Sequence, residues 1–260
     1  MATGNAPAAG HALDILTLLA RHATPVAAAT IARELGLPRS STYHLLGVLV
    51  EQGYAVHLPE DRRYGLGVAA FELGSAYTRQ APLQRLARPR LTRLADATGH
   101  NVHLAVLHGP DVLYVVEERV AGRPSLVTDV GVRLPATLTA SGLAILAALP
   151  PAQVRALYPA RESFVQRHGT GARSLVELRR ELSATRSRGY AVEDGLVTPG
   201  LASVASAVLD HSGHPVAGVA VTYPADHDLR IDEVVRLVRQ TAAELSVRLG
   251  HRDQGRSPVG

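Results

Sequence analysis

The chain contains no cysteine and no lysine. Without cysteine there are no disulfides, no thiolate ligands for a metal and no thiol nucleophile. Without lysine there is no Schiff-base chemistry and no Walker-type phosphate loop, and all 27 basic residues are arginine. No apolar run is long enough to cross a bilayer, and the first ten residues contain neither a basic residue nor an apolar signal core. We therefore expect a cytoplasmic protein without a membrane partner.

Composition places the chain among globular proteins with more than one domain. Its 260 residues exceed the length of an average domain, and 46% of them are hydrophobic and 19% charged. The net charge of +4 suits a nucleic-acid partner, but residues 1–80 contain six arginines and six acidic residues. DNA binding must therefore depend on where the arginines lie rather than on net charge.

The first 80 residues follow the pattern of three helices and a hairpin. The segments are residues 11–20, 28–35 and 38–52 for helices, 54–58 and 62–66 for strands, and 68–80 for a further helix. Gly36 ends the second helix, Leu37 fills a short turn, and Pro38 suits the first position of the third helix. This order is typical of a winged helix-turn-helix, although a plain three-helix bundle has the same spacing.

The start of the third helix is the part of such a motif that enters the major groove of DNA. Polar or aromatic side chains occupy it, with no acid before Glu51; they are Arg39, Ser40, Ser41, Thr42, Tyr43 and His44. Arginine grips guanine through two hydrogen bonds, hydroxyls reach phosphates or bases, and the N–H groups of a helix start attract phosphate. We expect these residues to contact DNA, with Arg62 and Arg63 positioning the hairpin wing.

The remainder mixes helices with antiparallel hairpins, which indicates an α+β sheet domain. Strands are expected at residues 101–108, 112–118, 126–130, 201–209 and 215–222. Helices are expected at residues 83–94, interrupted at Pro89, and at 141–149, 174–188 and 231–249. The end of the chain is polar with glycine and proline, which predicts a disordered tail.

The sequence indicates neither an enzyme site nor a metal site. No nucleophile stands beside a base, and the stretch GLASVA at 200–205 lacks the second glycine of a nucleophile elbow. His100, His103 and His108 have weak spacing for zinc and no cysteine partners. We therefore expect no enzyme activity, no metal and no cofactor.

Several stretches together resemble the IclR-type family of bacterial transcriptional regulators. They are IARELGLPRSSTYHLLGVLVEQG (31–53), YGLG (64–67), LARPRLTRLADATGHNVHLAVL (86–107), LPATLTASGLAIL (134–146), RSRGYAVEDGLVTPGLASVASAVLD (186–210) and PVAGVAVTYP (215–224). The resemblance covers nearly the whole chain. It implies dimers or dimers of dimers that bind palindromic double-stranded DNA operators. His44 departs from the pattern, because the family often has arginine near this position.

The resemblance also implies a division of the chain. Residues 1–67 would form the winged helix-turn-helix, 68–82 a linker helix, and 83–250 an effector-binding domain like a GAF or PAS sheet with helices on its faces. Residues 251–260 would form the disordered tail.

A sensor pocket needs a mostly apolar wall with a few converging polar groups. In family members that bind small carboxylic acids, the residues lining this pocket correspond by resemblance to Thr139, Ala140, Ser141, Gly142, Asp194, Ser203 and Thr222. Ala220 stands where a hydroxyl is common, which would suit a less polar or larger effector than a small oxo-acid. Each position also has a structural alternative, such as helix capping by Thr139 or close packing at Gly142.

The predicted function is a DNA-binding transcriptional regulator, repressor or activator, whose operator affinity is modulated by a small-molecule effector such as an organic acid. Two alternatives stay open. One is a small-molecule-binding or hydrolytic enzyme with an N-terminal oligomerisation domain, and the other is a winged-helix regulator of another class, such as a MarR-like protein. The acid-free start of the third helix, followed by an arginine-bearing hairpin, favours the first interpretation.

Overall fold

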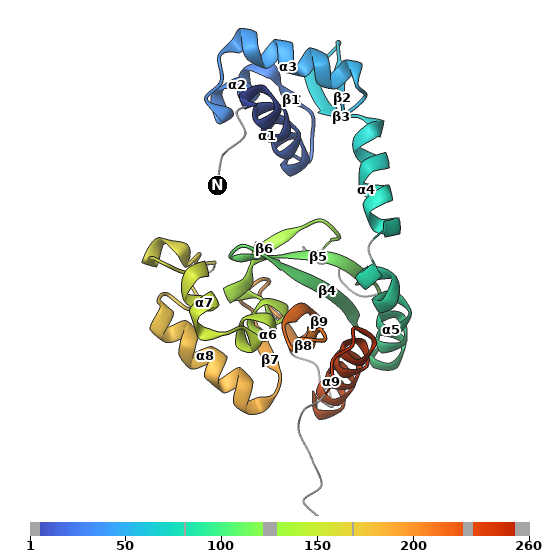
Figure 1. Ribbon diagram of the computed structural model, residues 1–260, viewed down its shortest axis with the longest axis vertical. Helices are drawn as coiled ribbons and strands as arrows, with labels where there is room; N and C mark the ends of the chain where they lie inside the picture. The colour runs from blue at the N-terminus through green and yellow to red at the C-terminus, as the bar shows by residue number, and fades with distance from the viewer. Residues whose placement is uncertain (1–5, 81, 122–128, 168, 226–230, 253–260) are drawn as a thin grey trace, which may run out of the picture. The chain divides into compact units, whose positions relative to one another are not determined.

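The computed structural model describes residues 6–80, 82–121, 129–167, 169–225 and 231–252 (Figure 1). The chain forms two compact units, Met1–Ala81 and Pro82–Gly260, and each has its own hydrophobic core. Among the described helices, none is both long and apolar enough to pass through a lipid bilayer.

The first unit is a helix-turn-helix followed by a hairpin. Its elements are α1 (Pro7–Arg21), β1 (Val26–Ala27), α2 (Ala28–Leu35), α3 (Arg39–Glu51), β2 (Ala55–Leu58), β3 (Arg63–Leu66) and α4 (Val68–Gln80). Gly36 ends α2 in the left-handed conformation, with φ of 65°, and so turns the chain toward the start of α3. β3 pairs with both β2 and the short β1, which joins the hairpin to the helices.

The core of the first unit lies where α1, α2 and α3 meet. Ile15 of α1, Ile31 of α2 and Leu46 of α3 are fully buried there. Burial of each such side chain contributes roughly 1.5–3 kcal/mol relative to exposure. The apolar spacing of each helix therefore specifies which face turns inward, and the opposite face of α3 is left to solvent.

The second unit is built on a six-stranded antiparallel sheet. The described strands, in sheet order, are β6 (Arg133–Pro135), β5 (Asp111–Glu118), β4 (Asn101–His108), β9 (Pro215–Pro224), β8 (Leu201–Leu209) and β7 (Ala191–Asp194). Because β4 pairs with β9, two hairpins far apart in sequence become one sheet. This pairing brings the early and late strands of the unit to one site.

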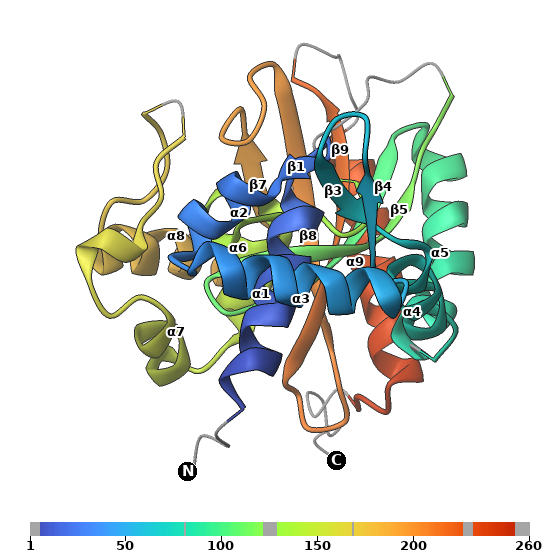
Figure 2. The same ribbon diagram turned by 90° about the horizontal axis from the view of Figure 1, so that it is seen from above.

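Helices cover both faces of this sheet (Figures 1 and 2). On one face lie α5 (Pro82–Thr98) and α9 (Ile231–Arg248), and on the other lie α6 (Ala140–Ala148) and α8 (Leu175–Arg188). Shorter helical segments are α7 (Pro151–Leu157) and the 3-10 turns Ala136–Leu138 and Arg161–Ser163. The predicted α+β class and the N-terminal helix-turn-helix are confirmed.

Gly218 of β9 sets how closely α6 approaches the sheet. A Cβ atom at this position would lie 2.7 Å from the backbone oxygen of Ser141, so only glycine permits the contact. The first turn of α6 is thereby held directly over β9. This close approach places Ser141 next to the sheet.

Two expectations about elements were not met. α5 continues through Pro89 instead of breaking there. Proline costs an interior helix about 3 kcal/mol, but Ala87, Leu91 and Leu94 of α5 are buried against the sheet and stabilise the continuous helix. The strand expected at residues 126–130 falls mainly outside the described residues, and Asp129 and Val130 are not in a strand.

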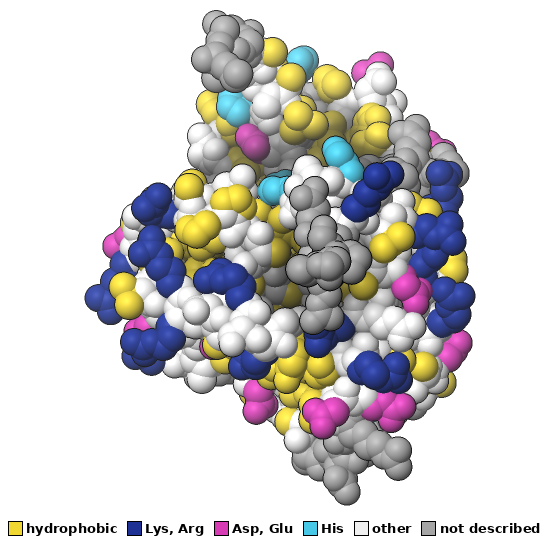
Figure 3. Space-filling model, turned by 60° about the horizontal axis from the view of Figure 1, so that its bottom comes forward, with side chains coloured by type: hydrophobic (Ala, Val, Ile, Leu, Met, Phe, Trp, Pro, Cys, Tyr) yellow, Lys and Arg dark blue, Asp and Glu magenta, His cyan; other side chains and the backbone are white. Residues whose placement is uncertain are grey.

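Arginine side chains gather at the flanks of the second unit. Figure 3 shows dark blue side chains at the left, on the side of α8, and at the right, on the side of α5. Arg88 forms an ion pair of 3.1 Å with Glu118, and Arg90 lies 3.8 Å from Glu244 of α9. The arginines of α5 thus lie on a largely solvated face of the helix and form ion pairs with neighbouring elements.

Candidate functional site

The start of α3 forms an exposed polar surface in the first unit. Arg39, Ser40, Ser41, Tyr43 and His44 are all exposed, and the first turn of α3 contains no acidic residue. No side chain caps the helix start, so its N–H groups are available to an anion. This surface has the chemistry that a phosphate backbone requires.

Thr42 does not belong to this surface. It is fully buried, and its hydroxyl donates a hydrogen bond of 3.0 Å to the backbone oxygen of Pro38. Thr42 lies four residues before the buried Leu46, so it shares the inward face of α3. The expectation that its side chain contacts DNA is therefore wrong for this conformation.

The two wing arginines have different surroundings. Arg62 lies at the tip of the β2–β3 hairpin in the left-handed conformation, with φ of 51°, and it is exposed. The guanidinium of Arg63 donates a hydrogen bond of 3.1 Å to the backbone oxygen of Pro25. Arg63 therefore joins the hairpin to the loop before β1, while Arg62 is exposed to solvent.

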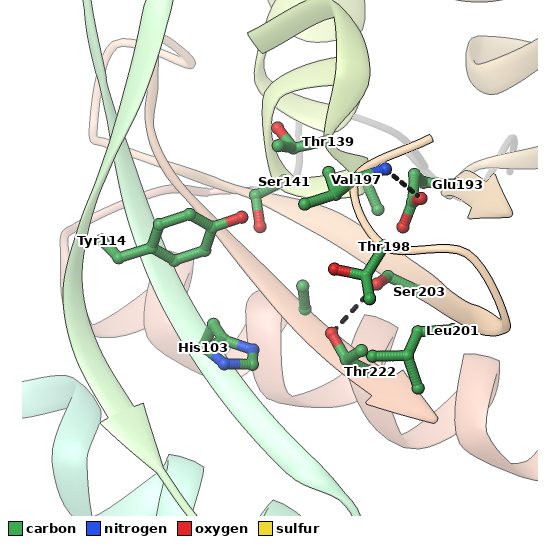
Figure 4. A pocket seen from close by; sticks show the side chains of 12 residues that line it. His103, Tyr114, Thr139, Ser141, Glu193, Val197, Thr198, Leu201, Ser203 and Thr222 are labelled. Carbon is green, nitrogen blue, oxygen red and sulfur yellow. Dashed lines mark hydrogen bonds between the residues drawn. The ribbon is translucent and has the colours of Figure 1, made fainter. Parts of the chain in front are cut away.

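The second unit contains a pocket over the middle of its sheet, here called the central pocket (Figure 4). Its cavity volume is about 30 Å³. Its lining residues are His103, Tyr114, Thr139, Ala140, Ser141, Glu193, Val197, Thr198, Leu201, Ser203, Ala220 and Thr222. They come from the start of α6, from five strands of the sheet and from the loop between β7 and β8.

The start of α6 forms one wall of the central pocket. Thr139 is the N-cap, and its hydroxyl accepts a hydrogen bond of 3.1 Å from the N–H of Gly142. The hydroxyl of Ser141 is buried and has no hydrogen-bond partner among the described residues. Since a buried hydroxyl without a partner is costly, Ser141 is a group that a ligand would satisfy.

Gly142 is not part of the lining. A Cβ atom at this position would lie 2.2 Å from the backbone oxygen of Ala136. Its role in this structure is close packing against the 3-10 turn that precedes α6.

A pair of hydroxyls forms the opposite wall. Ser203 of β8 and Thr222 of β9 are directly paired across the two strands, and their hydroxyl oxygens are 2.9 Å apart, within hydrogen-bond distance. Ala220, two residues before Thr222, reaches the same pocket without a polar group. The two hydroxyls therefore form the polar part of this wall, and Ala220 forms an apolar part beside them.

The acid of the pocket is Glu193 rather than the expected Asp194. Glu193 is buried, and its Oε1 accepts hydrogen bonds from the N–H groups of Leu196 (2.7 Å) and Val197 (3.1 Å). Asp194 is exposed and lines a different hollow, beside α8. Successive strand residues face opposite sides, so one of two adjacent acids enters the pocket.

Burial raises the pKa of the Glu193 carboxyl, and the two backbone hydrogen bonds only partly offset this effect. The carboxyl therefore holds a proton to a higher pH than an exposed glutamate does. A protonated Glu193 is able to donate a hydrogen bond to a ligand oxygen.

Sequence reasoning missed two aromatic side chains of the pocket. His103 of β4 is fully buried, and its Nε2 lies 3.4 Å from Oε1 of Glu117, which in turn pairs with Arg119 at 2.9 Å. Burial opposes ionisation of Glu117, but hydrogen bonds and charges from His103 and Arg119 outweigh it and lower its pKa. Tyr114 of β5 packs edge-on against His103, with ring centres 5.5 Å apart.

The signal for His103 was its polarity at a buried position between apolar residues of β4. Its neighbours Val102, Leu104 and Ala105 are all buried. A histidine among them is typical of a functional or paired side chain. In the described part of the chain, no three histidine or acidic side chains gather as ligands for a metal ion.

Models of two related domain families match the chain. Residues 75–247 match the C-terminal domain of the bacterial transcriptional regulator IclR. Residues 8–59 match the IclR helix-turn-helix domain. The two matches together span most of both units.

Characterised relatives agree with these matches. The chain is 28% identical over 253 residues to the transcriptional repressor IclR of Escherichia coli, covering 96% of this chain and 92% of that protein. It is 31% identical over 248 residues to the regulator BhcR of Paracoccus denitrificans, covering 94% and 88%. The crystal structure of Thermotoga maritima IclR is 27% identical and superimposes with a TM-score of 0.71, covering 94% of this chain and 99% of that one.

Proposed function

Since this chain belongs to the IclR family of bacterial transcriptional regulators, we propose that it binds palindromic operators as a dimer or dimer of dimers, under control of an organic acid. Its helix-turn-helix domain binds DNA and its C-terminal domain binds a small-molecule effector, as the family defines them. The family matches and the relatives named above are transcriptional regulators, so they give no support to the alternative of a small-molecule-binding or hydrolytic enzyme.

The DNA contacts are assigned to the exposed start of α3. Arg39, Ser41 and Tyr43 carry base or phosphate contacts, with Ser40 and His44 beside them. Their exposure, and the absence of an acid in the first turn, support this assignment. Arg62 at the tip of the wing contacts the flanking backbone, and Arg63 acts by holding the wing against the loop at Pro25.

The effector site is assigned to the central pocket. The observation that carries this assignment is the buried hydroxyl of Ser141, which lacks a partner among the described residues at the N-terminal end of α6. A helix start with a free hydroxyl favours a carboxylate. The hydroxyl pair of Ser203 and Thr222, opposite Ser141, suits a second oxygen of the same ligand.

The effector acts by favouring one of two arrangements of the oligomer. A ligand shifts such an equilibrium only by its difference in affinity for the two states. The central pocket joins α6 to both hairpins of the sheet, so a ligand that draws these elements together changes the shape of the whole unit.

The first test is DNA binding by the full chain. Fluorescence anisotropy would measure binding to DNA upstream of its own and neighbouring genes across a salt series, followed by a screen of carboxylic acids. We expect palindrome-dependent binding that weakens steeply with salt, and an acid that changes the affinity. Thr222→Val should remove the acid's effect and preserve DNA binding, while Thr92→Val, at an exposed position of α5, should preserve both.

Two results would overturn the proposal. Binding that ignores the palindrome would contradict operator recognition. An acid effect that persists unchanged in Thr222→Val would place the effector outside the central pocket.

A further inference from the structure

A further hollow, distinct from the one lined by Asp194, lies at the opposite end of α6 from the central pocket. Ala144, Ala147 and Ala148 of α6 bound it, together with the C-terminal end of α8 and part of β8. Its cavity volume is about 220 Å³. We call it the α8 hollow.

The α8 hollow arises because β7 is shorter than β8. The two strands pair only from Ala191↔Ala205 to Asp194↔Ala202, so residues 206–209 of β8 have no paired neighbour on that side among the described residues. The side chains of α6 at this level are alanines, which are too short to fill the space. The sheet edge and α6 therefore leave an apolar floor.

Thr185 is a buried polar residue in the lining of the α8 hollow. It lines the α8 hollow and is only 3% exposed, and its hydroxyl has no hydrogen-bond partner in the described chain. Threonine in a helix commonly satisfies its hydroxyl on the preceding turn. A buried hydroxyl left without this bond is available to a ligand.

Arg186 supplies a positive charge beside Thr185. Its guanidinium donates one hydrogen bond of 3.1 Å to the backbone oxygen of Ala147, which fixes it at the edge of the α8 hollow. Among the described residues, no carboxylate lies within 4.0 Å of Arg186. Arginine has five N–H donors in a planar fork that matches a carboxylate, so most of them remain available.

The neighbouring arginine does not share this property. Arg188 pairs with Glu181 at 3.1 Å and lies over the ring of Tyr190. Of the residues that line the α8 hollow in the described chain, Arg186 is the charged one.

We propose that the α8 hollow is a second ligand site, for a small monocarboxylate with a compact apolar body. The carboxylate lies on Arg186 and the Thr185 hydroxyl, and the apolar body rests on the alanines of α6. This site is separate from the central pocket and does not depend on the function proposed for it.

Calorimetric titration of the full chain with benzoate tests the proposal, with benzamide and benzylamine as neutral and cationic probes of the same shape. We expect saturable binding of benzoate at least about tenfold tighter than that of either control, because only the carboxylate matches the arginine fork. Arg186→Gln should weaken benzoate binding at least about tenfold. Arg180→Gln, an exposed arginine of the same helix outside the α8 hollow, should change it less than about twofold.

Two further variants locate the site. Ala148→Glu places a negative charge at the exposed edge of the α8 hollow without entering the core, so it should weaken benzoate binding even if Arg186→Gln fails to fold. Thr222→Val in the central pocket should leave this binding unchanged. Tighter binding of benzylamine, no saturable binding of benzoate, or loss with Thr222→Val but not with Ala148→Glu would overturn the proposal.

Discussion

Replacing Arg39 with alanine should weaken operator binding and make it less dependent on salt. Arg39 is the first residue of α3, it is exposed, and no acid lies within 4.0 Å of it among the described residues. Its charge is therefore not neutralised within the described chain and is available to a phosphate. In a dimer the substitution removes this charge twice.

The magnitude follows from counterion release. Each phosphate contact contributes about 0.9 to the slope of log affinity against log salt, so two lost contacts reduce the slope by about 1.8. Between about 50 and 200 mM salt, this difference amounts to a factor of roughly 12. The variant should thus lose about tenfold more affinity, relative to the natural protein, at the low salt concentration than at the high one.

Fluorescence anisotropy with a labelled operator, repeated across the salt series, measures both affinity and slope. Arg179→Ala, an exposed arginine of α8 in the other unit, is the matched control for loss of one positive charge. If Arg39→Ala binds with the same affinity and slope as the natural protein, Arg39 does not contact phosphate. A loss of affinity that is equal at every salt concentration, and that depends on the identity of one operator base pair, would instead indicate a base contact worth about 1–3 kcal/mol.

Three further predictions concern the second unit. Gly142→Ala should destabilise it by about 1–3 kcal/mol in urea unfolding, because the new Cβ would lie 2.2 Å from the Ala136 oxygen; an unchanged midpoint would refute the close packing. Ser203→Ala and Thr222→Val should show a coupling of about 0.5–1.5 kcal/mol in a double-mutant cycle, since their hydroxyls are 2.9 Å apart; strictly additive effects would argue against that bond. Glu193→Gln should gain stability relative to the natural protein as the pH rises. Burial raises the pKa of this carboxyl, so the natural protein loses stability as the pH rises from the pKa of the unfolded state to that of the folded state. A difference in unfolding free energy between variant and natural protein that is independent of pH between about pH 4 and pH 8 would contradict this.

Local pattern was sufficient to predict most of the elements. In the first unit, the helical spacing of apolar residues predicted the right helices. In the second unit, alternation of apolar residues predicted the strands β4, β5, β8 and β9. The predicted ends lie within a few residues of the observed ones. Pro89 was misjudged because its local cost is outweighed by burial of Leu91 and Leu94, which no local pattern includes. The short strands β1 and β6 were not predicted for the same reason, since pairing rather than propensity creates them.

The candidate site was predictable in part. Thr139, Ala140, Ser141, Ser203 and Thr222 all line the central pocket. Asp194, expected by resemblance, does not line the central pocket, whereas its neighbour Glu193 does. Adjacent strand residues differ only in the face they present, and the pairing of β7 with β8 decides which one faces the pocket. The burial of Thr42 likewise depends on how α3 packs in its unit, although its spacing from Leu46 indicated the inward face.

By itself, the sequence determined the class of fold, the order of the two units and the family, because hydrophobic periodicity and the ordered motifs are properties of the chain read in one dimension. The tertiary structure alone decided which polar groups meet. His103 faces Glu117 because β4 and β5 pair in one register, Ser203 meets Thr222 because β8 lies beside β9, and Thr185 and Arg186 face a hollow because β7 ends early. Each of these contacts joins segments whose distance in space is set by strand pairing and helix packing. The spacing of residues along the chain does not give that distance directly.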